Sequence, residues 1–197
     1  MRNWRLFCVV IISGLLVACS TPPVAPSKEY LLLDKGQVEA EPIATKSVAM
    51  HLLPVSVAPY LLGTELVLVS SQGEVFRSQN NLWAEPLSTQ LTRVSQQSLE
   101  HSLPNVTWFG HQSVPVDGVY QLNLEVDAFY ADLEGNVHIT GRWQLVSPAR
   151  KLLQVDTFTI VEPLQEDGYP AMVNTLSRLW QEKVVQVVST KISKDLL

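Results

Sequence analysis

Residues 120–133 alternate between mainly apolar and mainly polar positions, and this alternation constrains the fold more than any other feature of the sequence. One row consists of Leu122, Leu124, Val126, Ala128 and Tyr130. The other row consists of Gln121, Asn123, Glu125, Asp127 and Phe129. Successive side chains of a β-strand point to opposite faces of the sheet. The segment is therefore predicted to be a strand whose first row is buried and whose second row faces water.

Two more strands are expected directly after this one. Residues 134–136 form a turn into a second alternating segment, and residues 147–150 form a turn into a third strand over residues 152–161. The inward row of the second strand consists of Val137, Ile139, Gly141, Trp143 and Leu145. Short turns between alternating strands indicate an antiparallel meander.

Shorter strands are predicted earlier in the chain, over residues 30–33, 46–62, 65–70, 74–78 and 105–109. Pro54 and Pro59 make the second half of residues 46–62 an edge strand or an irregular one, because proline cannot donate to a strand ladder. Ser71-Gln72-Gly73 is typical of a hairpin loop between its flanking strands.

Two amphipathic helices are predicted, the first over residues 83–103 and the second over residues 170–194. In the first helix, Asn80 or Asn81 offers a cap, Pro86 fits the first turn, and Pro104 ends the helix. Its apolar positions are Leu87, Leu91, Val94, Leu99 and Leu103. The wide apolar stripe of the second helix consists of Met172, Leu176, Leu179, Trp180, Val184, Val187, Val188 and Ile192.

These elements predict an α+β fold in one domain over residues 30–197. The expected architecture has two layers, a mostly antiparallel sheet with both amphipathic helices packed on one face. The other face of the sheet is left open to solvent or to a partner.

The first 18 residues have the layout of a secretory signal peptide. Arg2 and Arg5 precede a nearly unbroken apolar run of 12 residues, Leu6–Val17, which is too short to span a bilayer. The run ends in Leu-Val-Ala-Cys, which resembles the bacterial lipobox. The resemblance implies that Cys19 is lipidated and becomes the new amino terminus. The alternative is that Cys19 is an apolar residue of an uncleaved anchor or of an ordinary signal peptide.

A lipidated Cys19 would carry three acyl chains by analogy with bacterial lipoproteins, and these would anchor the chain firmly. Ser20 stands where aspartate commonly signals retention in the inner membrane, so the resemblance favours the periplasmic face of the outer membrane. Residues 19–29 contain three prolines and no apolar periodicity. At about 3.1 Å per residue this tether would hold a periplasmic domain on the order of 30 Å from the bilayer.

Charge and cysteine content exclude several classes of function. Without its signal peptide the chain has 12 basic and 19 acidic side chains and a formal charge of −7. Such a chain is a poor candidate for binding nucleic acid or anionic lipid headgroups. Cys8 is removed with the signal peptide, so a disulfide, a catalytic cysteine and a cysteine-bound zinc are all excluded, and we expect no cofactor.

The sequence contains no recognisable catalytic motif. The histidines stand in separate predicted elements without metal-binding spacing, and they are His51, His101, His111 and His138. Glu125 and Asp127 share a strand face about 7 Å apart, a separation that glycosidase carboxylates use. Alternating acids are also the ordinary result of a half-buried strand. We therefore expect a protein that is not an enzyme, with a hydrolase as the alternative that Glu125→Gln and Asp127→Asn would test.

Three segments carry a resemblance to a known family. They are the Tyr30-Leu-Leu-Leu stretch after the tether, Leu53-Pro-Val-Ser-Val-Ala-Pro-Tyr-Leu61, and Trp83-Ala-Glu-Pro-Leu87 before a helix. With the order of the elements, they make the chain similar to the ABC-type transport auxiliary lipoproteins, from Tyr30 to the last helix.

The resemblance implies an accessory subunit of a lipid-trafficking system built on a membrane-spanning protein with MCE domains. Such a subunit acts by docking at the outer membrane, with self-assembly of the chain as a conjecture. Trp83 and Glu85 are the candidate partner-binding residues. The competing interpretation is that Trp83 joins the helix to the sheet and that Glu85 interacts with the helix dipole. A lipoprotein that regulates a cell-wall synthase is the alternative function.

Overall fold

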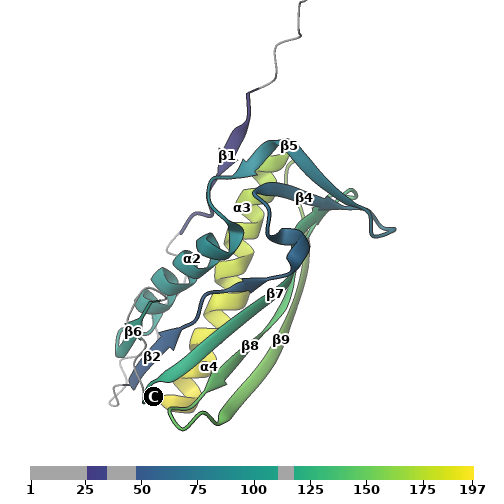
Figure 1. Ribbon diagram of the computed structural model, residues 1–197. Helices are drawn as coiled ribbons and strands as arrows, with labels where there is room; N and C mark the ends of the chain where they lie inside the picture. The colour runs from purple at the N-terminus through teal and green to yellow at the C-terminus, as the bar shows by residue number, and fades with distance from the viewer. Residues whose placement is uncertain (1–25, 35–47, 111–117) are drawn as a thin grey trace, which may run out of the picture.

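The computed structural model describes residues 26–34, 48–110 and 118–197. Figure 1 shows a twisted sheet with a helical layer on one face. The strands are β1 (Lys28–Tyr30), β2 (Val48–Leu52), β3 (Ser56–Val57), β4 (Glu65–Val69), β5 (Val75–Trp83), β6 (Val106–Phe109), β7 (Tyr120–Asp132), β8 (Asn136–Val146) and β9 (Leu152–Pro163). The helical elements are η2 (Pro59–Leu61), α2 (Leu87–Ser102), α3 (Tyr169–Leu179), η3 (Trp180–Val185) and α4 (Gln186–Leu196).

The long strand β7 organises the sheet. On one side it pairs antiparallel with β8, which pairs antiparallel with β9, so the predicted meander is confirmed. On its other side β2, β3 and β4 follow one another along β7, and all three run parallel to it. Beyond them lie β6, parallel to β2, and the β5 strand of the predicted hairpin with β4. The first strand, β1, runs parallel to β5.

The expectation of a mostly antiparallel sheet was wrong, because five of the eight pairings between the described strands are parallel. Parallel strands need a long crossover connection, and here β5, α2 and β6 lie between β4 and β7 along the chain. Turn residues in the sequence reveal only the hairpins, so they could not report pairings between segments this far apart. The α+β class and the two helices on one face are as expected.

A β-bulge at Asp127 changes the alternation of β7. The register with β8 shifts between Val126 and Ala128, and a bulge inserts one unpaired residue into a strand. Beyond it Phe129, paired with Ile139, is buried, while Tyr130 is only partly buried. The predicted faces of these two aromatic residues were therefore exchanged.

The first helix begins later than predicted. Pro86 is the residue before the helix, and Trp83 is the last residue of β5. Asn80 and Asn81 lie within β5 and cap nothing. Proline disfavours helical geometry at the residue before it, so Glu85 is kept out of the helix. The first strand is also shifted, since β1 spans Lys28–Tyr30 in place of residues 30–33.

The second predicted helix is continuous in the chain but is not uniformly α-helical. A π-helical segment, η3, joins α3 to α4. Buried residues at steps of four, Trp180, Val184, Val188 and Ile192, would drift around an α-helix of 3.6 residues per turn. A π turn holds more residues, so it reduces this drift and keeps the apolar stripe on the sheet.

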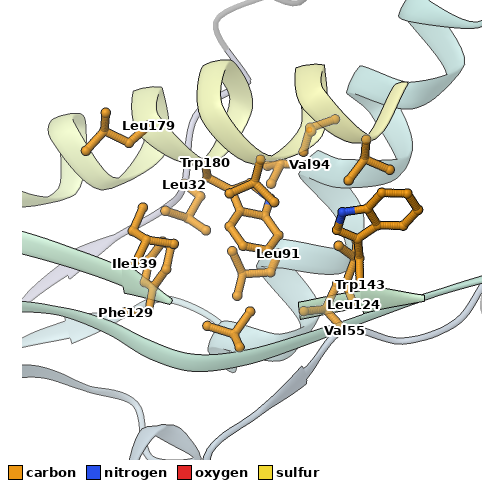
Figure 2. Close-up of a cluster of buried hydrophobic side chains, with 14 of the residues drawn as sticks. Leu32, Val55, Leu91, Val94, Leu124, Phe129, Ile139, Trp143, Leu179 and Trp180 are labelled. Atoms are coloured by element: carbon orange, nitrogen blue, oxygen red, sulfur yellow. The ribbon is translucent and has the colours of Figure 1, made fainter. Parts of the chain in front are cut away.

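The core lies between the helical layer and the sheet, as Figure 2 shows. Trp180 is 0% exposed at its centre. Its ring meets Phe129 and Phe158 edge to face, with centroids 6.1 and 5.9 Å away, and its indole N–H donates to Ser95 Oγ at 2.9 Å. Edge-to-face pairs of this kind add to the stabilisation from burial. Trp180 thus holds the long helix, α2 and the sheet together.

Candidate functional site

The segment that leads from the predicted tether into the domain is fixed by several elements. We call residues 28–33 the anchor junction. Its first half is β1, which pairs with the end of β5, and Ala84 N–H donates to Tyr30 O at 2.9 Å. Leu32 is 1% exposed in the core, while its neighbours Leu31 and Leu33 are exposed. A pull on the tether would therefore be transmitted directly to the core.

Two buried glutamines hold the backbone of the anchor junction, and we call Gln90 and Gln181 the glutamine clasp. Leu32 N–H donates to Gln90 Oε1 at 2.6 Å, and Gln90 Nε2 donates to Glu85 O at 3.0 Å. Gln181 Nε2 donates to Leu33 O at 2.6 Å. Both glutamines are essentially excluded from solvent. Because buried backbone groups must find partners, the clasp satisfies the part of the junction after β1, where Leu32 and Leu33 lie outside any strand.

Cys19, the signal peptide and most of the tether lie outside the described residues. The lipidation of Cys19 thus stays a prediction. Among residues 26–34, 48–110 and 118–197, no helix is both long and apolar enough to cross a bilayer.

Trp83 packs into the domain. It is 4% exposed, its ring lies 6.2 Å from that of Phe129, and it pairs with Tyr30 across β1 and β5. This arrangement joins the anchor junction to the sheet, as the packing interpretation of Trp83 requires. A contact of Trp83 with a partner protein stays a prediction.

Glu85 lies outside the helix that follows it. No acidic residue stands in the first turn of α2, so the interpretation of Glu85 as a first-turn residue was wrong. Its exposed carboxylate stands 3.9 Å from Arg93 Nε, and an exposed pair at that distance contributes little to stability. The carboxylate of Glu85 remains accessible, and its role in partner binding stays a prediction.

The sheet face opposite the helices carries an aromatic row. Tyr60 and Tyr130 rings lie 6.5 Å apart, and the Tyr130 ring stacks on His138 at 5.0 Å. Tyr60 OH donates to Asp127 O at 2.8 Å. Burial, helped by Tyr130 and by the charge of Asp127, raises the pKa of Tyr60 to about 12. The hydroxyl therefore stays a proton donor at neutral pH.

Asp132 ends this row as a charged acceptor. His138 Nε2 lies 2.7 Å from Asp132 Oδ2, and Asn136 donates to Asp132 through its backbone and its side chain at 2.7 and 3.0 Å. Burial raises the pKa of Asp132, but the hydrogen bonds from His138 and Asn136 outweigh that effect and leave the pKa below its usual value. In the folded domain the carboxylate of Asp132 is therefore ionised at neutral pH.

Replacing Asp132 by asparagine is expected to lower the free energy of unfolding by about 1–2 kcal/mol at pH 7. Because the pKa of Asp132 is lower in the folded state, its stabilisation is present above the unfolded pKa of about 3.9 and is lost as pH falls through the folded pKa. Urea unfolding between pH 3 and pH 7 measures the free energy of unfolding of the wild-type protein and of the Asp132→Asn variant. We expect the difference between these two free energies to shrink below about pH 4. Asp127→Asn, on the same face, is the control. A difference independent of pH would contradict the assignment.

The carboxylates Glu125 and Asp127 do not form a catalytic pair in the structure. Arg142 Nε donates to Glu125 Oε2 at 2.6 Å, and Asn123 Nδ2 donates to its other oxygen at 3.2 Å. Asp127 is exposed at the bulge. Glu125 is thus engaged in an ion pair with Arg142, and both side chains remain partly exposed to solvent.

The described histidines do not gather into a metal site. His51 lies on β2, His101 in the last turn of α2, and His138 beside Asp132. His111 lies outside the described residues. Within the described part of the chain, no group of three or more histidine, cysteine, aspartate or glutamate side chains is placed to hold a metal ion.

A shallow apolar hollow of about 210 Å³ lies where β4 and β7 end. Its walls include Leu68, Leu133, Leu164 and Met172. This hollow, the anchor junction and the open sheet face are the surfaces of the domain that a partner protein could contact.

Comparison with known proteins decides which family this arrangement belongs to. Residues 30–188 match the family described as ABC-type transport auxiliary lipoprotein component. The chain belongs to this family. The match begins at Tyr30, the last residue of β1, and ends in α4, so it includes strands β2 to β9, α2 and both residues of the clasp. A lipoprotein component is held to a membrane by a lipid anchor, and its family is a class of transport auxiliaries without enzymatic activity.

Relatives agree with this membership. The lipoprotein is 27% identical over 190 residues to "Intermembrane transport lipoprotein PqiC" of Escherichia coli (strain K12), covering 95% of this chain and 96% of that one. A crystal structure of an uncharacterized protein matches with a TM-score of 0.72 and 26% identity over 85% of this chain and 99% of that one. The crystal structure of XCC0632 from Xanthomonas campestris shares the fold, with a TM-score of 0.65 and 17% identity over 84% of this chain and 92% of that one.

Sequence reasoning missed the glutamine clasp. Gln90 interrupts the apolar positions of α2, and Gln181 follows Trp180 in the stripe of the last helix. A neutral polar residue on the buried face of a helix needs a hydrogen-bond partner. That signal was present, but the partner was a backbone segment far away in the sequence.

Proposed function

We propose that this lipoprotein is a docking subunit of an intermembrane lipid transport system of the MCE type and that it helps maintain the integrity of the cell envelope. The match of residues 30–188 to the transport auxiliary lipoproteins is the observation that carries the proposal. The likeness to PqiC supports it, because that protein is described as an intermembrane transport lipoprotein. The role proposed here is non-enzymatic.

The geometry of the anchor junction supports a role that transmits force between a membrane and a partner. The backbone of Leu32 and Leu33 is held by the glutamine clasp, so the tether ends in the core of the domain and not in a surface loop. A subunit that docks a larger assembly onto a membrane needs such a firm connection.

The proposed anchor is the lipid on Cys19, after removal of residues 1–18 as a signal peptide. Ser20 favours the outer membrane, where the domain would face the periplasm. Residues 19–29 then place the domain within reach of the far end of a complex that bridges the periplasm.

The proposed partner is a membrane-spanning protein with MCE domains, similar to PqiB. The open face of β7 and β8 offers a docking surface, since its aromatic row and its Glu125–Arg142 pair remain accessible beside the buried core. Self-assembly of the lipoprotein would match an oligomeric partner.

Affinity purification of the tagged lipoprotein from gently crosslinked membranes tests the proposal. We expect the wild-type protein to recover an MCE-domain protein and the Cys19→Ala variant to lose at least about nine-tenths of that recovery, because a soluble variant loses the effective concentration that anchoring provides. Equal expression of the two proteins is the control. Recovery of a cell-wall synthase, or of no partner by either protein, would contradict the transport role.

A further inference from the structure

The apolar hollow beside α3 is preformed and differs from the open sheet face. Its walls come from the end of β4, the β7–β8 turn, the loop between β9 and α3, and the first turn of α3. Leu164 N–H donates to Gly135 O at 2.8 Å, so the loop and the turn are joined to each other. Tyr169 and Met172 of α3 close one side. The walls are therefore held together before a ligand binds, and preorganisation of this kind favours binding.

Exposed apolar side chains extend the hollow at its margin. Leu133, in the β7–β8 turn, is 54% exposed. Phe76 of β5 pairs with Leu68 of β4, which lines the hollow, and is 46% exposed. Directly opposite residues of antiparallel strands have neighbouring side chains on one face. Figure 1 shows the β4–β5 hairpin projecting from the body of the domain, at the end where α3 lies. Apolar side chains gathered at one place on a surface mark a contact site.

Three acidic residues stand on the loops that form the hollow. Glu134 lies in the β7–β8 turn, and Glu166 and Asp167 lie in the loop between β9 and α3. All three are exposed, and none forms an ion pair with another described residue. Residues 131–136 and 164–172 contain no lysine or arginine. The margin of the hollow therefore carries negative charge without basic residues beside it in the sequence.

The first arginine after each of these segments is already paired with other carboxylates. Arg178, in the last turn of α3, donates to Glu182 Oε2 at 2.9 Å and to Glu162 Oε2 at 3.1 Å. Arg142, which follows the β7–β8 turn, is paired with Glu125. Opposite charges across an interface steer association and discriminate against wrong partners. The acids at the hollow thus favour a basic partner.

We propose that the hollow binds an extended segment of a partner protein in which an apolar side chain is flanked by lysine or arginine. The apolar side chain enters the hollow, and the basic side chains meet Glu134 of the turn and Glu166 and Asp167 of the loop. The volume of about 210 Å³ is smaller than the roughly 300–1,000 Å³ of small-molecule sites. It suits one anchoring side chain, and buried anchors of this kind supply much of the affinity of an interface.

Charge separates this occupant from two others. Acidic loops repel anionic lipid headgroups, and a second copy of the chain has a formal net charge of −5 and so few basic groups to offer. The proposal stands independently of the transport role, because it concerns the chemistry of the occupant and not the system that supplies it.

Peptide binding to the purified lipoprotein in phosphatidylcholine nanodiscs tests the proposal, because a zwitterionic bilayer does not attract a basic peptide. The probe is rhodamine-labelled Gly-Lys-Lys-Leu-Phe-Lys-Lys-Gly, and a second probe has glutamate in place of each lysine. By fluorescence anisotropy at low salt we expect the basic probe to bind with a dissociation constant below about 100 μM. The acidic probe should bind at least about tenfold more weakly, since like charges oppose association. Empty nanodiscs are the control.

A matched pair of substitutions tests the apolar contact. Leu133→Ser removes an apolar side chain at the hollow, and Leu152→Ser removes one of nearly equal exposure, 54% against 52%, at the far end of β9. We expect Leu133→Ser to raise the dissociation constant of the basic probe at least about fivefold, because apolar area removed from water contributes to affinity. Leu152→Ser should leave this constant unchanged.

Two double variants test the charge. Glu166→Gln with Asp167→Asn removes two acids from the loop, whereas Glu100→Gln with Asp195→Asn removes two exposed acids from α2 and α4. We expect the first double variant to bind the basic probe at least about fivefold more weakly at low salt. This difference should shrink near 1 M salt, where the screening length is about 3 Å. The second double variant should bind as the wild-type protein does.

Equal binding of the two probes would overturn the proposal, and so would equal binding of the basic probe by Leu133→Ser and Leu152→Ser or by the two double variants. Two further results would overturn it by naming another occupant. If Leu133→Ser abolishes flotation of the unlipidated Cys19→Ala variant with phosphatidylethanolamine vesicles, the hollow takes lipid. If Leu133→Ser instead lowers the sedimentation coefficient of the lipoprotein in detergent, the hollow takes a second copy.

Discussion

Replacing Trp180 by alanine is expected to lower the free energy of unfolding by about 3–5 kcal/mol, because truncating a fully buried tryptophan removes its transfer free energy and leaves a cavity. Trp180 is 0% exposed, and its ring contacts Phe129 from β7 and Phe158 from β9. The substitution also leaves Ser95 Oγ without its indole donor. These losses fall on the contacts that join both helices to the sheet.

Chemical denaturation of the wild-type protein and of the Trp180→Ala variant measures this loss in the free energy of unfolding. Val187→Ala is the matched control, because Val187 lies on the same continuous helix but is 45% exposed; it should change the free energy of unfolding by less than about 0.5 kcal/mol. A loss below about 1 kcal/mol for Trp180→Ala would mean that Trp180 does not hold the layers together as the structure has it.

Replacing Gln90 by leucine is expected to release the anchor junction while the rest of the domain stays folded. The substitution removes the acceptor of the Leu32 N–H and the donor to Glu85 O, and each buried group left without a partner costs about 1–3 kcal/mol. We expect a total of about 2–4 kcal/mol, below the sum of two full penalties, because burial of the leucine side chain offsets part of the loss. The loss should appear first as local opening at residues 28–33, since local segments open below the global free energy of unfolding.

Hydrogen exchange detects this opening directly. We expect the amide of Leu32 to exchange about 10- to 1,000-fold faster in Gln90→Leu, since each 1.4 kcal/mol corresponds to a factor of ten. Amides in the centre of β8 should be affected much less. Gln97→Leu changes an exposed glutamine of the same helix and controls for the altered side chain. Unchanged exchange at Leu32 would show that the clasp does not hold the junction.

Sequence patterns predicted the local elements of this fold well. The alternation of residues 137–145 gave the correct buried face of β8, and the spacing of Leu87, Leu91 and Val94 gave the buried face of α2. The period of a strand or helix is a local property, so it can be recognised without knowing the partner. Pro54 and Pro59 likewise marked the place where β3 and η2 replace a continuous strand.

Two features of the fold could not be obtained in the same way. The parallel pairing of β2, β3 and β4 with β7 joins residues such as Met50 and Tyr120, and no short turn marks a contact of that range. The bulge at Asp127 leaves the composition of β7 unchanged while it reverses the faces of Phe129 and Tyr130. Only the register with β8 reveals it.

The sequence pointed to two segments of the anchor junction but not to the contacts that hold it. The absence of catalytic motifs agrees with a family of transport auxiliaries, and the Tyr30 stretch and Trp83 meet in the structure through β1 and β5. The role of Gln90 and Gln181 depends on a backbone segment that only the tertiary fold brings to them. Glu85 was misplaced because the extended conformation before Pro86 excludes it from the helix.

Photocrosslinking from the open sheet face tests the central claim of docking most directly. A photoreactive phenylalanine derivative at Thr140, in the centre of β8, would report contacts of that face in living cells, and the same residue at the exposed Lys183 would report the helical layer. We predict that the Thr140 probe crosslinks to an MCE-domain protein in the strain with intact Cys19 and that the Lys183 probe does not. Crosslinking of a cell-wall synthase, or of the MCE-domain protein from Lys183 alone, would contradict the account.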